Sequence, residues 1–514
     1  SLLYPMSITP NKQKPALLIA LCWAMLLPFS STFSQTVLKE LEKDLQEFRL
    51  SAAEEKIHSL EAPKLRAYYA CNILIYKYFS TQQSEYYSAL DNYFDQAVDI
   101  IENSPADSMR EVFLSDLYGK RAVIAFLDHN YFQAIRYARN CHKLIDKSRD
   151  KYGDHIEQMK IRGLFNALLG AIPRKYQWIS NTLGYKGDIQ KARIQLEVAA
   201  RESSFLRQEA LFILYFVEKN MFNETHKSLA RLEAKRKEIG GNILMDFILA
   251  SGYLSTKNNK KALEALNRRG YYSRKDIFFI PYWDYLMGKA YYYKGTHSLS
   301  QMYFSRFLKG YEGKVFKSDA YFRLAMSYTL EGKYEQGRTY FQLIADGKKQ
   351  GLDEDEYAKF MAEKFSQKKP SAYQLSLFRV RNLFDGGYLL NALELLTELE
   401  QTSFAQLNLE ERTELYYRYG RIYQQDGKNK LALTYYEKCR KEAKSEQSWL
   451  QAYATFYSGE IRRKQAQPSE AKVLYKEALT FKDYFYQNGL ENRCKIALSE
   501  LKKELKNQAS ASNR

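Results

Sequence analysis

The sequence predicts an all-α fold in which about a dozen helical hairpins stack into a solenoid. The first observation is an internal repeat, because residues 284–304 and 321–341 align position by position at a spacing of 37 residues. The second is that equivalent small residues recur at steps of 33 to 40 residues, with one longer step of 55. The third is composition, since 10 Pro and 24 Gly in 514 residues leave little room for linkers. Repeats of this length stack into one continuous object.

Small residues are expected where the two helices of a repeat cross at short distance, because a large side chain there would hold the helices apart. On the first helices these residues are Gly288, Ala325 and Gly420. On the second helices they are Ala192, Thr225, Ala262, Ser300, Gly337, Ala392, Ala432 and Ala471. Glycine is also expected to end the first helix, where a positive φ costs it little. The candidates for this role are Gly295, Gly332 and Gly427.

Residues 1–34 are expected to form an export signal. Lys12 and Lys14 precede an apolar run over residues 16–29, and residues 30–34 are small and polar apart from Phe33. Cleavage after this pattern would place the mature N-terminus at Gln35 and the protein in the periplasm or outside the cell. The alternative is an uncleaved segment that anchors the protein in a membrane.

The rest of the chain follows in order as hairpins, one inserted helix and a terminal cap. The segments are 35–116 (N-terminal helical hairpins), 117–352 (repeats), 353–370 (an inserted helix), 371–480 (repeats) and 481–514 (a capping helix and polar tail). Within the second segment, residues 173–200 fit the repeat, and residues 154–169 are expected to be an extra helix. The acidic start and lysine-rich end of the inserted helix suit the helix dipole.

The C-terminal repeats resemble the tetratricopeptide repeat (TPR) family. The matching residues are Tyr416, Tyr419, Gly420, Tyr423, Gly427, Ala432 and Tyr436. The resemblance implies a right-handed superhelix and a role in binding other proteins. Residues 169–173 (LGAIP), 183–188 (LGYKGD) and 281–288 (PYWDYLMG) are similar to the tetratricopeptide repeat protein 39 family, which includes the fungal inclusion-body clearance protein. The expected export departs from the intracellular eukaryotic members, so only the fold and an adaptor role carry over.

No motif of catalysis or metal binding occurs in the sequence. The six His are dispersed, and neither a P-loop, an H-E-x-x-H nor a G-x-S-x-G pattern is present. Cys71, Cys141, Cys439 and Cys494 lie far apart, which excludes a C-x-x-C motif and favours small buried side chains. We therefore predict that the protein is not an enzyme and has no catalytic residue, no metal site and no cofactor.

The formal net charge of +18 raises the question of an acidic partner. Lys and Arg do not gather in one arm or segment, so the sequence predicts no nucleic-acid partner. Peripheral contact with an acidic envelope surface is compatible with this charge.

The TPR resemblance implies that three positions of each first helix face the concave groove. In this chain the predicted groove residues are Phe247, Tyr285, Lys289, Tyr292, Phe322, Met326, Tyr417, Arg421, Gln424, Phe456 and Arg463. An aromatic and cationic groove suits an extended peptide or a partner helix. The alternative is that these rings pack only against neighbouring helices. Tyr or Phe stands where carboxylate-clamp proteins of the family have Lys, so a carboxylate clamp is not expected.

The sequence thus predicts an exported, non-enzymatic scaffold or adaptor that binds a protein or peptide in its groove, in a cell-envelope assembly. Two alternatives stay open. One is an enzyme or a glycan-binding protein that uses the same groove. The other is the periplasmic half of a membrane-anchored sensor.

Overall fold

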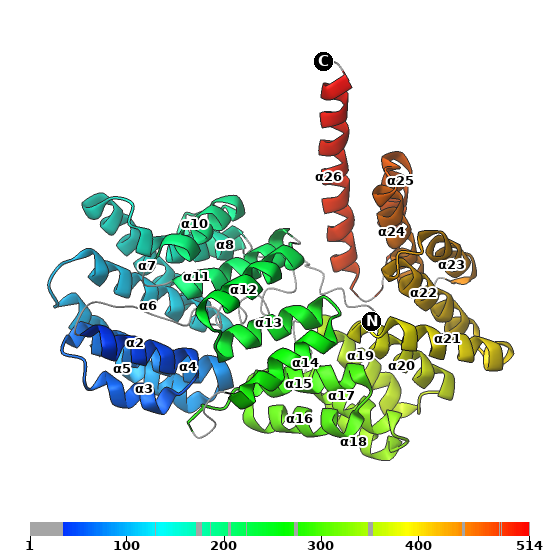
Figure 1. The fold of residues 1–514 in the computed structure, drawn as a ribbon, viewed down its shortest axis with the longest axis horizontal. Helices are drawn as coiled ribbons and strands as arrows, with labels where there is room; N and C mark the ends of the chain where they lie inside the picture. The colour runs from blue at the N-terminus through cyan, green and yellow to red at the C-terminus, as the bar shows by residue number, and fades with distance from the viewer. Residues whose placement is uncertain are drawn as a thin grey trace.

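The computed structural model describes residues 34–512, apart from 129, 171–176, 186, 204–206, 223, 272–275, 348–352, 445–447, 483 and 485. Every regular element in this part of the chain is helical, as Figure 1 shows, and this confirms the predicted all-α solenoid of hairpins. The predicted export signal lies outside the described residues except for Ser34. Among the helices that the structure describes, none is long and apolar enough to cross a membrane.

Most helices pair with a neighbour in sequence to form hairpins. The pairs are α2 (Ser34–Gln46) with α3 (Leu50–Ile57), α4 (Pro63–Thr81) with α5 (Ser84–Glu102), α6 (Ser108–Leu127) with α7 (Tyr131–Tyr152), α8 (Met159–Gly170) with α10 (Ile189–Glu202), α11 (Arg207–Val217) with α12 (Thr225–Ile239), α13 (Ile243–Ser255) with α14 (Asn259–Asn267), α15 (Pro281–Lys294) with α16 (His297–Gly310), α17 (Lys317–Leu330) with α18 (Tyr334–Asp346), α20 (Ala372–Gly386) with α21 (Leu389–Ser403), α22 (Leu409–Gln425) with α23 (Asn429–Glu442), and α24 (Ser448–Lys464) with α25 (Pro468–Ala478). The helices outside these pairs are α9 (Gln177–Leu183), α19 (Asp353–Gln367) and α26 (Gln487–Ser512).

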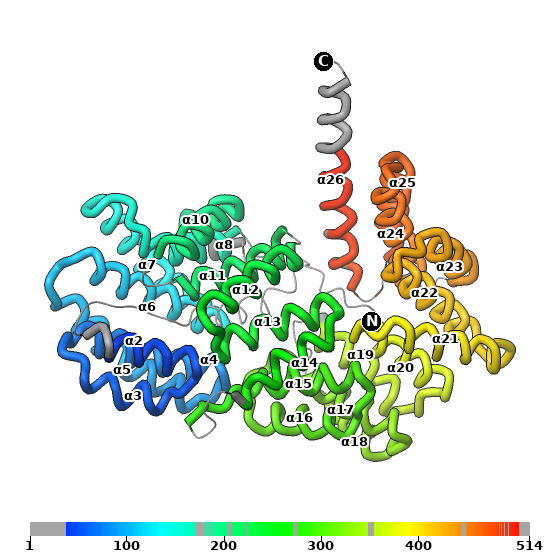
Figure 2. Tube along the Cα trace, in the orientation of Figure 1, coloured from blue at the N-terminus to red at the C-terminus, as the bar shows by residue number. Residues whose placement is uncertain are grey.

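The path of the chain curves, as Figure 2 shows. The hairpins up to α12 lie on one side, those from α13 to α18 run along the middle, and those from α20 to α25 lie on the other side. One apolar core extends from Leu38 to Phe365 and a second from Leu377 to Leu501.

Apart from Thr225, the predicted small residues are buried between helices. A Cβ added to Gly420 would lie 2.5 Å from ring atoms of Tyr436, and one added to Gly337 would lie 2.5 Å from the carbonyl oxygen of Ala325. The predicted helix-ending glycines have φ values of +81°, +82° and +76°, in the order Gly295, Gly332 and Gly427. The helix-ending glycines are confirmed, and so are the small residues apart from Thr225. Thr225 begins α12 and is partly exposed, and the buried small residue of that helix is Ser228.

The partner of α10 is α8, and the expectation that residues 154–169 are an extra helix is wrong. A Cβ at Gly163 in α8 would lie 2.7 Å from Leu196 and 3.1 Å from the Ala192 carbonyl oxygen, so α8 and α10 cross closely there. Helix α9, which begins the segment assigned to a repeat, packs on α7 instead. The extra helix is therefore α9.

The inserted helix α19 changes the order of packing. It packs on α17 and α18, and the next helix, α20, then returns to pack on α15. The turns of two hairpins meet as a result, because Lys257 Nζ lies 2.8 Å from Asp385 Oδ1 and Asn259 Nδ2 donates to the Tyr388 hydroxyl at 2.9 Å. Hairpins that are distant in sequence are thus in direct contact.

The N-terminal hairpins also reach the middle of the chain. The N–H of Phe278 donates to the Phe48 carbonyl at 2.7 Å, and the N–H of Glu312 donates to the Thr81 carbonyl at 3.0 Å. Helix α4 packs on α15 at the same place. The first two hairpins and the hairpin of α15 and α16 therefore belong to one packed body.

The four described cysteines are buried and unpaired, as predicted: Cys71, Cys141, Cys439 and Cys494. Burial raises the pKa of the Cys71 thiol to about 12. It remains a neutral thiol at physiological pH and packs as a small apolar side chain.

Candidate functional site

The structure places the predicted groove residues on the first helices of their hairpins and buries most of them. On α13, α15 and α17 they are Phe247, Tyr285, Lys289, Tyr292, Phe322 and Met326, and on α22 and α24 they are Tyr417, Arg421, Gln424, Phe456 and Arg463. Their exposed fractions are 8% or less, except for the partly exposed Gln424 and Arg463. These rings fill space between helices, and a role in partner binding stays a prediction.

Arg323 of α17 is the charged centre of the groove residues on α15 and α17. Its Nε donates to Asp319 Oδ2 at 2.7 Å, and the Tyr285 hydroxyl donates to the same oxygen at 2.7 Å. Burial, together with the positive charge of Arg323, lowers the pKa of Lys289 to about 7. Near neutral pH this buried lysine is therefore divided between its charged and neutral forms.

Three cations and three aromatic rings alternate across the second half of the chain, and we call this series the cation–aromatic ladder. Its members, in spatial order, are Lys257, Phe384, Arg421, Tyr457, Arg493 and Phe456. Lys257 Nζ lies 4.5 Å from the ring centroid of Phe384, and the guanidinium carbon of Arg421 lies 5.4 Å from it. The ladder thus begins at the turn between α13 and α14 and continues through α20 and α22.

The far end of the ladder places two arginines around one tyrosine. The guanidinium carbon of Arg421 lies 3.6 Å from the ring centroid of Tyr457, and that of Arg493 lies 5.3 Å from it. Arg493 lies 4.3 Å from the ring of Phe456, so helix α26 completes the series. Burial alone would raise the pKa of Tyr457, but the positive charges of Arg421 and Arg493 outweigh burial and lower it.

The ladder carries more positive than negative charge. Lys257 pairs with Asp385, whose pKa falls to about 2 because the charges of Lys257 and Arg381 outweigh its burial. Neither Arg421 nor Arg493 forms an ion pair within the part of the chain that the structure describes, and Arg421 Nε is buried without a hydrogen-bond partner. Cation–π contacts with the rings stabilise these two arginines in part.

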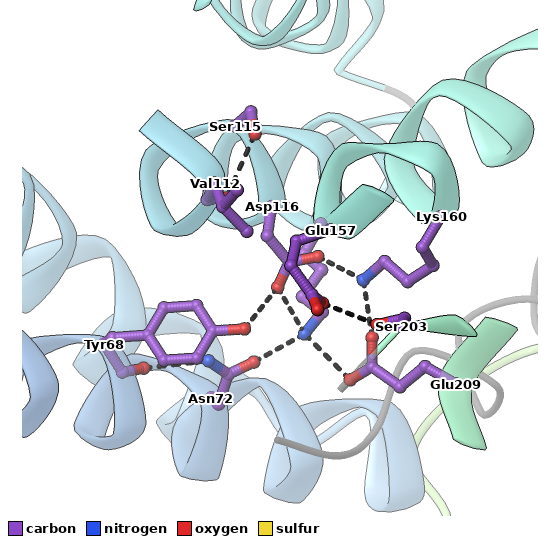
Figure 3. Close-up of polar contacts among 10 residues, drawn as sticks. Tyr68, Asn72, Val112, Ser115, Asp116, Glu157, Lys160, Ser203 and Glu209 are labelled. Carbon is purple, nitrogen blue, oxygen red and sulfur yellow. Dashed lines mark hydrogen bonds and ion pairs between the residues drawn. The ribbon is translucent and has the colours of Figure 1, made fainter. Parts of the chain in front are cut away.

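A second buried cluster, shown in Figure 3, is balanced in charge. Its members come from α4, α6, α8 and α11, are at most 2% exposed, and are Tyr68, Asn72, Asp116, Lys120, Lys160 and Glu209. Lys120 Nζ lies 2.8 Å from Asp116 and 3.2 Å from Glu209, and Lys160 Nζ lies 2.5 Å from Glu209 and also contacts Asp116.

Two ammonium groups and two carboxylates satisfy one another in this cluster. The charges of Lys120 and Lys160 outweigh burial and lower the pKa of Asp116 to about 2. The Tyr68 hydroxyl donates to Asp116 at 2.7 Å, and Lys120 donates to the Asn72 side-chain oxygen at 2.7 Å. The arrangement fastens four helices together. Sequence reasoning missed it because its members come from four helices, with Tyr68 and Asn72 on α4, Asp116 and Lys120 on α6, Lys160 on α8 and Glu209 on α11.

The outer surface carries a pocket between α7 and α9. It has a volume of about 320 Å³ and is lined by Phe132, Ile135, Arg136, Arg139, Asn140, Lys143, Trp178 and Thr182. Phe132 is 83% exposed and Trp178 is 41% exposed. Sequence reasoning missed this pocket because it assigned α9 to a repeat hairpin, whereas the structure places α9 beside α7. Within the described residues, no group of His, Cys, Asp and Glu could hold a metal ion.

Comparisons with known proteins do not assign the chain to a family. No protein-family model matches it, and no curated protein matches it. Among solved structures, the APC/C hetero-tetramer Cut9–Hcn1 is similar at 11% identity over 93% of this chain and 91% of that chain, with a TM-score of 0.29. A Rap protein complexed with competence and sporulation factor is similar at 15% identity over 79% of this chain and 96% of that chain, with a TM-score of 0.27. At these values the comparisons support no conclusion about function.

Proposed function

We propose that the protein is a non-enzymatic scaffold that binds an acidic segment of a partner protein beside the cation–aromatic ladder. The observation that carries this proposal is the ladder's excess of positive charge, with the buried Arg421 and the partly exposed Arg493 stacked on rings and in no ion pair within the described chain. A buried charge without a counter-charge costs several kcal/mol. The carboxylates of a bound segment would supply the missing negative charge.

Partly exposed side chains at the end of the ladder offer a route for such a segment. Gln424, Arg463 and Arg493 are partly exposed, and they lie on α22, α24 and α26. Gln424 orients Arg421, whose Nη1 donates to the Gln424 side-chain oxygen at 2.9 Å. An extended or helical segment that lies across these helices would meet cations and aromatic faces in turn, as peptide-binding grooves require.

Binding of a defined acidic peptide tests this proposal. Residues 35–514 are titrated into a fluorescein-labelled peptide of glutamate and leucine, and anisotropy is recorded at low salt. We expect the double variant Arg421→Gln/Arg493→Gln to weaken binding at least about tenfold, because each lost charge-assisted contact contributes on the order of 1 kcal/mol.

The control variant Arg149→Gln/Arg201→Gln removes two arginines whose side chains are 45% and 69% exposed and which lie far from the ladder in sequence. Its affinity should match that of the unmodified protein. Equal affinity in the ladder variant, or no binding by the unmodified protein, would contradict the proposal.

We also propose that the scaffold acts after export, in a cell-envelope assembly. The two lysines and the apolar run of residues 12–29 support export. Sequencing of the native protein should give Gln35 as the mature N-terminus. Retention of residues 16–29 would instead indicate a membrane-anchored form.

A further inference from the structure

Two outer helix faces depart from the repeat in the same way. The position two residues before the small crossing residue of a second helix faces outward. In six other hairpins it holds an exposed polar residue, namely Gln190, Lys260, Ser298, Glu335, Lys430 or Ser469. At the same position α7 has Phe132, which is 83% exposed, and α21 has Leu390, which is 76% exposed. A single exposed apolar side chain is common on protein surfaces, so binding by these faces is inferred from the charged residues that follow Phe132 and Leu390 on them.

The side chains that follow Phe132 on the outer face of α7 are basic. Arg136, Arg139 and Lys143 are exposed and line the pocket between α7 and α9. Arg139 donates to the Thr182 carbonyl of α9 at 2.7 Å. None of these three cations forms an ion pair with a carboxylate among residues described by the structure.

The side chains that follow Leu390 on the outer face of α21 are acidic. Glu394 and Glu398 are exposed, and the helix contains no Lys, Arg or His. Neither glutamate forms an ion pair with any described lysine or arginine. The first charged residue of each face stands four positions after the apolar residue, and it is Arg136 in α7 and Glu394 in α21. The two faces therefore have the same order of groups and opposite charge.

We propose that α21 of one copy docks on the α7–α9 pocket of a second copy, so that chains associate head to tail. In a parallel register Leu390 packs on Phe132, Glu394 meets Arg136, and Glu398 meets Arg139. The spacing fits, because both helices rise about 1.5 Å per residue and the paired groups recur at one-turn intervals on each. The pocket beside Trp178 gives room for leucine side chains at the centre of the contact.

The two faces lie on opposite sides of the molecule, as Figure 1 shows for α7 and α21. A contact between two different faces is heterologous, and it builds a ring or an open chain rather than a closed dimer. One helix pair covers less area than the roughly 1,600 Å² of a standard interface, so we expect micromolar affinity. Because charge supplies much of the contact, added salt should weaken it.

Sedimentation velocity on residues 35–514 tests the proposal. Between about 2 and 200 µM in about 50 mM NaCl, the weight-average mass should rise at least about twofold, and it should return to the monomer value in about 500 mM NaCl. The variants Arg136→Glu/Arg139→Glu and Glu394→Lys/Glu398→Lys should each remain monomeric. An equimolar mixture of the two variants should associate again. The acidic α7 of the first variant matches the basic α21 of the second, and the unchanged acidic α21 of the first matches the unchanged basic α7 of the second.

The control variant Lys260→Glu/Lys472→Glu reverses two exposed lysines on other outer helices, and it should associate like the unmodified protein. Arg421→Gln/Arg493→Gln should also associate normally, since the ladder is a separate site. A protein that stays monomeric at low salt, or variants that fail to associate when mixed, would overturn the proposal. Binding of a labelled acidic peptide by a monomeric protein, lost in Arg136→Glu/Arg139→Glu, would instead assign the pocket to a different acidic partner.

Discussion

Buried charged side chains form two clusters that differ in their balance of charge. Around Asp116 and Glu209, two lysines match two carboxylates at contact distance, so the cluster needs nothing from outside the chain. In the cation–aromatic ladder, the buried Arg421 and the partly exposed Arg493 contact rings and form no ion pair within the described residues. The balanced cluster is explained by folding alone, whereas the unbalanced one supports the proposed binding of an acidic segment.

Replacement of Lys289 by methionine tests whether a groove lysine reduces stability. The folded-state pKa of about 7 lies below the ordinary 10.5, so the unmodified protein should gain stability as pH rises through that window. Lys289→Met removes the buried charge and should raise the free energy of unfolding at pH 7 by about 1–4 kcal/mol. Urea unfolding of both proteins at pH 7 and pH 10 measures the difference in their free energies of unfolding. The difference should shrink at the higher pH, and a destabilised variant at pH 7 would contradict the argument.

Asp385 should make stability depend on acid pH. Its folded-state pKa of about 2 lies below the ordinary 3.8, so its contribution is present above pH 4 and is lost as pH falls toward 2. The shift corresponds to about 2 kcal/mol. Asp385→Asn should be less stable than the unmodified protein at pH 6, and the two should converge as the pH falls to about 2. Parallel pH curves from urea titrations would show that Asp385 does not titrate as described.

At the scale of helices, the repeat predicts crossings well and predicts hairpin partners less well. Gly420 and Gly337 could be identified from sequence because every hairpin needs a small residue at the same register. The pairing of α8 with α10 could not, because α9 also fits the repeat pattern before α10. Gly163 was the available signal, since a Cβ at this residue of α8 would lie 2.7 Å from Leu196 and 3.1 Å from the Ala192 carbonyl oxygen of α10.

Gly420→Leu should overpack one crossing. The added side chain would collide with the Tyr436 ring, where even a Cβ would lie at 2.5 Å, and should cost about 1–3 kcal/mol or more. Hydrogen exchange should show lost protection in residues 415–479 and little change in residues 117–145. Uniform loss from 117 to 479 would indicate a single cooperative unit. Tyr417→Ala should lower protection near Gly420 as well, because the Tyr417 ring is fully buried.

At the scale of the whole molecule, sequence period predicts stacking and does not predict contacts between distant hairpins. The period implies that each hairpin touches its neighbours. The inserted helix α19 breaks this order, because α20 then packs on α15. The groove residues Arg421 and Phe456 were predicted from the repeat, but Lys257 and Arg493 were not. Their positions depend on which helices distant in sequence pack together, and a local sequence pattern does not specify this packing.

Lys257→Met tests that long-range contact. It leaves the buried Asp385 without its nearest cation and should cost about 2–4 kcal/mol. Exchange protection should fall in residues 243–267 and also in residues 372–425, although the two partners are 128 residues apart. Lys261→Met removes a half-exposed lysine and should change stability by less than about 1 kcal/mol. Loss of exchange protection confined to residues 243–267 would instead indicate that each hairpin is stabilised only by its neighbours in sequence.

The contacts of Lys257 and Asn259 with Asp385 and Tyr388 also bear on the elasticity of the molecule. A solenoid held only by neighbouring repeats stretches like a spring, because a pulling force opens each interface a little. Here the turn between α13 and α14 is tied to the turn between α20 and α21, so the helices between them form a closed loop. A force applied to the chain on either side of that loop would be carried by the contacts between the two turns, and the helices within the loop would not be strained. The middle of the molecule should therefore behave as a stiff block, with compliance confined to the hairpins outside it.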